Sequence, residues 1–263
     1  MSTEPWKTAI TKVEPNKILV RGYRVDELMG KISFGQAVYL LLRGELPSRN
    51  VGRLMEAMLV SSIDHGVTPP STLAAMTVAS TGSTLNAALA TGVLAINKFH
   101  GGAIEDCMRF LQEVWAFKAE KKLSAEEAAA TLIRQYREQK KRISGFGHRY
   151  HTQDPRTRKL FSMAKELGIA GEFVDIAEAV EAELQKALGK KLPINVDGAI
   201  ATLLCELEFP PALANAFFIM ARMPGWVAHI YEEQTRQKPM RVIEPRNYEY
   251  DGPEERPVPE ESL

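Results

Sequence analysis

Residues 144–149 read Ser144-Gly145-Phe146-Gly147-His148-Arg149, and Asp154-Pro155-Arg156 follows a few positions later. The two glycines allow the backbone to come close to a ligand, because no Cβ blocks the approach. An Asp-Pro pair is typical of the cap and first turn of a helix, so we expect the chain to change here from loop to helix. Such a turn presents the His148 side chain into a cleft. A histidine on a glycine turn is weak evidence alone, so other groups must converge on it.

The composition is that of an ordinary soluble globular protein. The chain has 263 residues, 45% hydrophobic and 25% charged, which is enough to bury a full core. Its 33 basic and 33 acidic residues give a formal net charge of zero, so no global field would attract nucleic acid or an acidic membrane. Cys107 and Cys205 lie in apolar helical patterns without metal-type spacing, and we expect buried free thiols and no metal site.

The N-terminal residues lack a basic start followed by an apolar run, so no secretory signal is expected. The longest apolar runs, near 87–96 and 213–221, fall short of the roughly 20 residues that cross a bilayer. We therefore predict a cytoplasmic protein without membrane contact.

Hydrophobic periodicity predicts a nearly all-helical chain. One small hairpin is expected from the short apolar runs at 8–13 and 17–20. The small, uncharged residues of 69–97 indicate helices packed at short separation, within one chain or between subunits. A helix with Arg222 is expected to kink at Pro224-Gly225, and residues 238–263 form an extended C-terminal arm. The other predicted helices begin or run at 34–42, 50–63, 104–115, 124–139, 155–168, 172–188 and just after 198.

Three of the five histidines, His65, His100 and His148, stand beside a glycine, and His151 follows His148 closely. His229 is in the middle of a helical pattern and is interpreted as a core histidine. Carbon–carbon chemistry next to a thioester would need such groups together. Its parts are a carboxylate base, donors that stabilise an enolate oxygen, and arginines for substrate carboxylates.

Asp197 would be that carboxylate, and Arg156 and Arg222 those arginines.

The sequence also resembles the citrate synthase superfamily, and within it the lyase-type members that cleave citryl-CoA. The motifs that carry the resemblance run in family order along the chain: 18–23, 39–47, Asp64-His65-Gly66, His100-Gly101-Gly102-Ala103, Gly145-Phe146-Gly147-His148-Arg149, Asp154-Pro155-Arg156, Asn195-Val196-Asp197-Gly198 and Ala221-Arg222.

The resemblance implies an all-α, citrate synthase-like fold, with a helical core over 1–237 that includes a small domain at about 145–205. It assigns the thioester carbonyl and its enol to His100, the oxygen of the four-carbon unit to His148, and the acetyl carbon to the carboxylate of Asp197.

The resemblance also implies the binding groups. His65 would bind oxaloacetate or the citryl group. The groups that would hold substrate carboxylates are Arg156, Arg222 and Arg246, and those that would receive coenzyme A are Arg142, Gly145, Phe146 and Gly147. No permanently bound cofactor is implied, because the coenzyme A thioester is itself substrate or product.

Two departures from the family pattern bear on the substrate. Pro47 precedes Asp64 by only 17 positions, where the synthases carry a long additional segment and the lyase-type members do not. The tail reads Glu244-Pro245-Arg246, where many members have Arg before Pro. Glu244 would repel a substrate carboxylate, so either Arg241 or Arg246 takes that role or the substrate differs.

The leading hypothesis is therefore a homodimeric or homotetrameric enzyme that cleaves citryl-CoA to acetyl-CoA and oxaloacetate. A separate synthetase would supply the thioester, since no phosphate-gripping nucleotide loop is present in the sequence. Three alternatives remain: a synthase that condenses an acyl-CoA with a 2-oxoacid, a silent coenzyme A-binding subunit, and a helical domain whose histidines only fill turns.

Overall fold

The computed structural model describes residues 5–98, 100–148 and 152–241. The predicted hairpin is confirmed, with strands β1 (Thr11–Glu14) and β2 (Lys17–Val20) paired antiparallel so that Thr11 faces Val20. A third strand of two residues, β3 (Tyr23–Arg24), extends it to a sheet of order β1-β2-β3.

Helices make up most of the described chain, as the periodicity predicts. In chain order they are α1 (Val25–Leu28), α2 (Phe34–Arg43), α3 (Arg49–Ser61), α4 (Pro70–Ser80), α5 (Leu85–Leu94), α6 (Ala103–Lys121), α7 (Ala125–Glu138), α8 (Pro155–Glu166), α9 (Glu172–Leu188), α10 (Val196–Glu206), the short 3-10 helix η1 (Pro211–Leu213) and α11 (Ala214–Arg236).

Local capping explains several of these boundaries. Ser124 and the side chain of Glu127 form a capping box at the start of α7, within the helix predicted at 124–139. Asp154 caps α8 and Pro155 is its first residue, which confirms the loop-to-helix change expected there. Gly189 ends α9 in the left-handed conformation.

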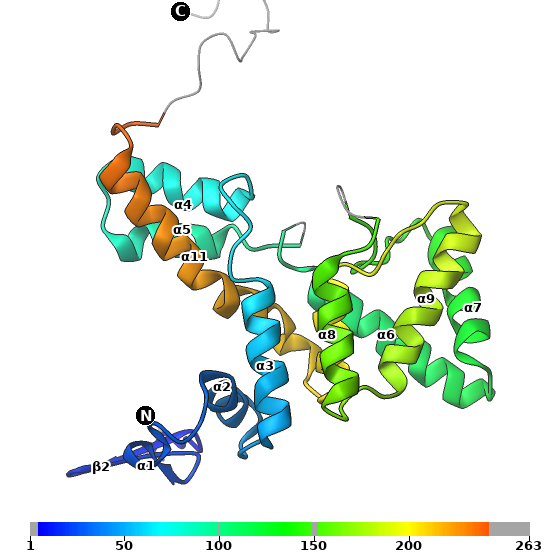
Figure 1. Cartoon of the computed structure of the whole chain (residues 1–263), viewed down its shortest axis with the longest axis horizontal. Coiled ribbons are helices and arrows are strands. Elements are labelled where there is room, and N and C mark those ends of the chain that lie inside the picture. The colour runs from blue at the N-terminus through cyan, green and yellow to red at the C-terminus, as the bar shows by residue number, and fades with distance from the viewer. Residues whose placement is uncertain (1–4, 99, 149–151, 242–263) are drawn as a thin grey trace, which may run out of the picture.

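The helices pack around two hydrophobic clusters. The larger cluster contains residues of α3, of the helices α6 to α10, and of the first half of α11. It includes both free cysteines, Cys107 and Cys205, which are buried as predicted. The smaller one lies between α4, α5 and the second half of α11, around the buried Trp226 and Ile230. Figure 1 shows α4 and α5 beside α11 on one side, and α6, α7 and α9 on the other, with α3 and α8 between them.

The contact between α4 and α5 is tight, as their small residues indicate. A Cβ on Gly92 of α5 would lie 3.3 Å from the Cβ of Ala75 and 3.3 Å from the backbone oxygen of Ser71, both on α4. Since Gly92 has no Cβ, the two backbones approach closely.

The helix predicted to kink at Pro224-Gly225 is assigned as one continuous helix, α11, that passes through both residues. Gly225 is required there by packing, because a Cβ on it would lie 2.5 Å from the backbone oxygen of Ile63 and 2.9 Å from Oδ1 of Asp64. The turn after α3, which carries His65, therefore lies directly against α11.

The start of the predicted arm is docked on the helices. Met240 N donates to Ser80 O at 2.8 Å, and Arg241 N donates to Ser80 Oγ at 3.1 Å. The Arg241 guanidinium pairs with Glu233, a carboxylate of α11 that is 3% exposed. The remainder of the arm lies outside the described residues. The small-domain bounds stay a prediction.

Gly225→Ala tests the contact of α11 with the turn after α3. Overpacking of this kind costs about 1–3 kcal/mol, whereas alanine is better than glycine inside a helix by up to about 1 kcal/mol. We expect the overpacking to dominate and the Tm measured by calorimetry to fall. Ala228→Gly, at an exposed position of α11, is the control for helix propensity, and a higher Tm for Gly225→Ala would contradict the assigned packing.

Candidate active site

The glycine loop, residues 144–148, lies against the segment 193–195 that leads into α10. Gly147 N donates to Pro193 O at 2.7 Å, and Asn195 N donates to Gly145 O at 3.0 Å. Phe146 and Ile194 form an antiparallel bridge between these bonds. Gly145 and Gly147 have φ values of 87° and 94°, which an L side chain rarely adopts. This pairing brings His148 and the start of α10 together.

Packing also explains why Gly145 is a glycine. It is buried, and a Cβ on it would lie 2.5 Å from Sγ of Cys107 and 2.9 Å from the Cα of Gly198. A Cβ on Gly198 would in turn lie 2.2 Å from Gly145 O. The sequence interpretation of Gly145 as a residue that only admits a ligand is therefore incomplete.

The predicted carboxylate, Asp197, is the second residue of α10 and so belongs to its first turn, not to the preceding loop. Burial raises the pKa of the Asp197 carboxyl, and the negative charge of Asp154 adds to this effect. The positive charges of Arg156 and Arg222 act in the opposite direction but do not cancel it. Asp197 thus holds a proton more readily than an exposed aspartate does.

At the start of α8, Arg156 is held by Asp154, whose side chain is fully buried. Arg156 Nε donates to Asp154 Oδ1 at 3.0 Å and Nη2 donates to Oδ2 at 2.8 Å. Burial opposes ionisation of Asp154, but hydrogen bonds from Arg156 and the charge of His148 outweigh it, so the pKa of Asp154 is lowered. The fork of hydrogen bonds fixes the direction of the Arg156 guanidinium.

α11 contributes Arg222, which is 3% exposed. Its Nε donates to Ser62 O at 2.8 Å, and its guanidinium lies 4.7 Å from the ring centre of Phe218. The same ring also contacts His100 edge-to-face. Phe218 therefore positions one cation and one imidazole.

The imidazole of His100 follows α5, and its Nε2 lies 2.8 Å from Oγ of Ser71 on α4. Ser71 is fully buried. Burial, followed by the charge of Arg222, lowers the pKa of His100. The imidazole is therefore neutral at neutral pH, with one nitrogen engaged by a hydroxyl.

His65 lies in the turn between α3 and α4. Asp64 holds this turn by accepting from Gly66 N at 2.9 Å, and its Oδ1 lies 3.0 Å from Nε2 of His229 on α11. Desolvation, then the charges of Arg156 and Arg222, lower the pKa of His65. His229 thus supports the His65 turn from a half-buried position on α11, so the expected core position is not what the structure shows.

The charges that shift each pKa connect the predicted residues with one another. Arg156 and Arg222 act on both His65 and Asp197, and Arg222 also acts on His100. His148 joins through its effect on Asp154. We define this group as the histidine–arginine cluster: His65, His100, His148, Asp154, Arg156, Asp197 and Arg222.

Sequence comparison assigns the family at this point. Residues 47–246 match the family described as citrate synthase, C-terminal domain. The chain belongs to the citrate synthase family.

Among its relatives, citrate synthase 2 of Bacillus subtilis is 33% identical over 216 residues, which cover 81% of this chain and 54% of that protein. The chain thus spans about half the length of the curated citrate synthases that it matches. A solved citryl-CoA lyase from Hydrogenobacter thermophilus is 48% identical, with a TM-score of 0.88 and coverage of 98% of this chain and 99% of that one.

The fold is shared more widely. A solved ATP citrate lyase from Methanothrix soehngenii, in complex with citrate and coenzyme A, has a TM-score of 0.82 at 22% identity. The match covers 97% of this chain and 43% of that one. The resemblance to the citrate synthase superfamily, with its lyase-type members, is confirmed.

Four residues considered in the sequence analysis do not join the histidine–arginine cluster in the described part of the chain. Arg142 is exposed in the segment after α7. Arg246 lies outside the described residues, as does Glu244. Arg241, the alternative to Arg246, is bound to Glu233 and Ser80 and is not directed to the cluster by any of these bonds.

Sequence reasoning missed Ser71 and the role of Asp154 in holding Arg156. Ser71 gave no signal, because a serine in a run of small residues is typical of helix packing. Asp154 was interpreted only as a helix cap.

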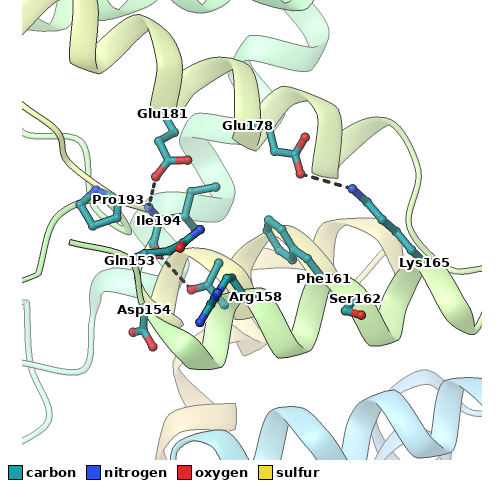
Figure 2. Close-up of a pocket in the computed structure, with 11 residues that line it drawn as sticks. Gln153, Asp154, Arg158, Phe161, Ser162, Lys165, Glu178, Glu181, Pro193 and Ile194 are labelled. Atoms are coloured by element: carbon teal, nitrogen blue, oxygen red, sulfur yellow. Dashed lines mark hydrogen bonds and ion pairs between the residues drawn. The ribbon is translucent and has the colours of Figure 1, made fainter. Parts of the chain in front are cut away.

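Behind the cluster, a cavity of about 490 Å³ opens between α8 and α9. Figure 2 shows its polar groups in structural contacts: Glu181 accepts from Ile194 N, and Lys165 pairs with Glu178. Asp154 lies at the edge with its carboxylate directed away from Phe161 and Lys165. None of the predicted catalytic residues lines this cavity.

Within 5–98, 100–148 and 152–241, no group of His, Cys, Asp or Glu side chains is arranged to hold a metal ion. No helix in that part of the chain is long and apolar enough to cross a membrane.

Asp197→Asn should raise the Tm at neutral pH. The folded state raises the pKa of Asp197 above its ordinary value of 3.8. Between pH 3.8 and the folded pKa, the folded protein therefore binds more protons than the unfolded protein. The free energy of unfolding falls as pH rises through that window. Above this window the carboxyl group is ionised, so the free-energy cost of its buried charge is fully present. The substitution by asparagine removes that cost.

The matched control is Asp106→Asn, an exposed aspartate in the first turn of α6. We expect no gain in Tm from this variant. The gain from Asp197→Asn should shrink in acid, where the carboxyl is protonated in wild type. A lower Tm for Asp197→Asn at pH 7 would contradict the assigned burial.

Proposed function

We propose that this protein is a citryl-CoA lyase-like enzyme that cleaves citryl-CoA to acetyl-CoA and oxaloacetate. The observation that carries the proposal is the 48% identity to a citryl-CoA lyase with nearly complete coverage of both chains. The matching citrate synthases are much longer than this chain. The short connection from Pro47 to Asp64 is consistent with the lyase type.

In the proposed reaction, His148 takes the proton from the citryl hydroxyl. The electrons of that O–H bond form the ketone of oxaloacetate, the carbon–carbon bond breaks, and its electron pair enters the thioester as an enolate. His148 suits this role because it lies on the glycine loop beside the start of α10. It also lies in the field of the Asp154 carboxylate, which stabilises an imidazolium.

His100 stabilises the enolate oxygen. The imidazole is neutral, so if the Ser71 hydroxyl donates to Nε2, the proton of the ring is on Nδ1. Nδ1–H can then donate to the thioester oxygen as negative charge develops there. Ser71 sets the tautomer in this mechanism.

Asp197 returns a proton to the acetyl carbon. Its raised pKa favours a protonated carboxyl group that is able to donate. The hydroxyl proton taken by His148 and the proton given by Asp197 balance, and both groups are restored by exchange with water. No oxidant or reductant takes part.

Arg156 and Arg222 hold the carboxylates of the substrate, and His65 contacts the same unit. Because the whole chain has a formal net charge of zero, the attraction of an anionic substrate is local to the histidine–arginine cluster. We further propose that Gly145, Phe146, Gly147 and Arg142 contact coenzyme A. A separate synthetase as the source of citryl-CoA, and a cytoplasmic location, stay predictions.

The direct test supplies citryl-CoA to the purified protein and measures oxaloacetate by coupled reduction to malate. We expect turnover in wild type. General acid–base groups contribute about 10²–10⁴-fold, so His148→Ala and Asp197→Asn should each lower kcat by that order. Release of oxaloacetate no faster than background in wild type would reject the lyase activity.

A synthase is the second candidate, because the matching curated relatives are citrate and 2-methylcitrate synthases. Free thiol release from acetyl-CoA with oxaloacetate separates the two, since a lyase lacks efficient thioester hydrolysis. Binding of coenzyme A without either turnover would favour the silent subunit.

We propose in addition that the chain forms a homodimer, or a homotetramer built from such dimers, through α4 and α5. The buried cluster under these helices has only five members. Their outer surfaces expose Leu73, Leu85 and Leu94, with exposed fractions of 44%, 44% and 76%. Apolar side chains gathered on one helical unit are typical of a subunit interface.

Sedimentation velocity tests this interface with Leu85→Glu and Leu94→Glu. We expect each buried charge to shift the protein from oligomer to monomer. Leu188→Glu is the control, at a 38% exposed leucine that ends α9. Figure 1 shows α9 on the opposite side of the molecule from α4 and α5. A wild-type monomer at micromolar concentration would contradict the proposal.

A further inference from the structure

Asn195 makes three hydrogen bonds that join the glycine loop to α10. Its backbone N donates to Gly145 O at 3.0 Å. Its side-chain Nδ2 donates to Gly147 O at 2.9 Å, and its Oδ1 accepts from Gly198 N at 3.1 Å. One partner needs a donor and the other an acceptor, so the orientation of the amide is determined.

The bond to Gly147 O acts directly on His148. This carbonyl belongs to the peptide group that continues into the backbone N of His148, and Gly147 N is itself bound to Pro193 O at 2.7 Å. Both peptide groups of Gly147 are thus tied to the segment 193–195. Asn195 stands two positions before Asp197, so one side chain spans the two groups that the proposed reaction uses for proton transfer.

We propose that Asn195 is a positioning residue that fixes His148 relative to Asp197. The inference rests on the proposed roles of these two residues. The proton is taken at one end of the breaking bond and given at the other, so the two side chains must keep their separation as the bond breaks. A displacement of about 1 Å can cost about 10²-fold in rate.

The backbone contact of Gly145 with Gly198 cannot replace the Asn195 amide. That contact brings the loop to α10 at Gly145, but it does not hold the carbonyl of Gly147. The Asn195 amide holds this carbonyl directly. A helix cap needs only the oxygen, which Ser and Asp also provide, so the nitrogen of the amide separates positioning from capping.

The experiment therefore compares Asn195→Ser and Asn195→Asp. Both keep an oxygen that accepts from Gly198 N, and neither can donate to Gly147 O. We expect kcat for citryl-CoA cleavage to fall about 10²-fold in both, at a temperature where circular dichroism shows each variant fully folded. The control is Asn50→Ser, which removes a similar amide-to-carbonyl bond, from Asn50 Nδ2 to Leu167 O at 3.0 Å, away from the cluster.

Amide hydrogen exchange supplies a readout that does not depend on the substrate. In Asn195→Ser, exchange should accelerate in peptides that cover 144–148 and stay slow in α10. The inference is overturned if 144–148 keeps wild-type exchange, or if either variant keeps wild-type kcat. If wild type fails with citryl-CoA but condenses acetyl-CoA with oxaloacetate, the same variants are measured in that reaction, and an unchanged kcat again overturns the inference.

Discussion

The glycine-to-glycine contact between Gly145 and Gly198 is the constraint on which the candidate site depends. With a Cβ on either residue, the loop that carries His148 and the helix that carries Asp197 would be forced apart. The Sγ atom of Cys107, on α6, also lies close to Gly145. Burial is also the principal cause of the raised pKa of Asp197, one residue before Gly198. The packing constraint thus sets the separation of the two segments that carry His148 and Asp197.

Much of the fold could be predicted from the sequence, since most boundaries depend on local chemistry. The Ser124–Glu127 capping box, Asp154-Pro155 and Gly189 act within a few residues of the helix end that they define. α11 was predicted less well. A Pro-Gly pair favours a kink, and one helix runs through both residues; the sequence did not indicate that Gly225 is packed against the turn after α3. That contact joins distant segments and leaves no local signal.

The site shows the same division. Histidines beside glycines and the motif order predicted six residues that the structure gathers with Asp154. The residues that hold them in place, such as Ser71 and Asn195, were not distinguished, because a buried hydroxyl or a cap amide gives no sign of its partner in the sequence. Arg156 was expected to hold a substrate carboxylate, but the two hydrogen bonds that it donates to Asp154, and that direct its guanidinium, were not predicted. Such second partners depend on tertiary structure.

The members of the histidine–arginine cluster come from widely separated parts of the chain. His65 and Arg222 are 157 positions apart, and the turn after α3, the link before α6, the glycine loop and the starts of α8 and α10 each supply one or two groups. Long-range contacts of this kind form late, because closing long loops is entropically costly. During refolding, helical content should therefore return before the site does. An intermediate with nearly native helicity would be catalytically silent, and activity would report completion of the fold.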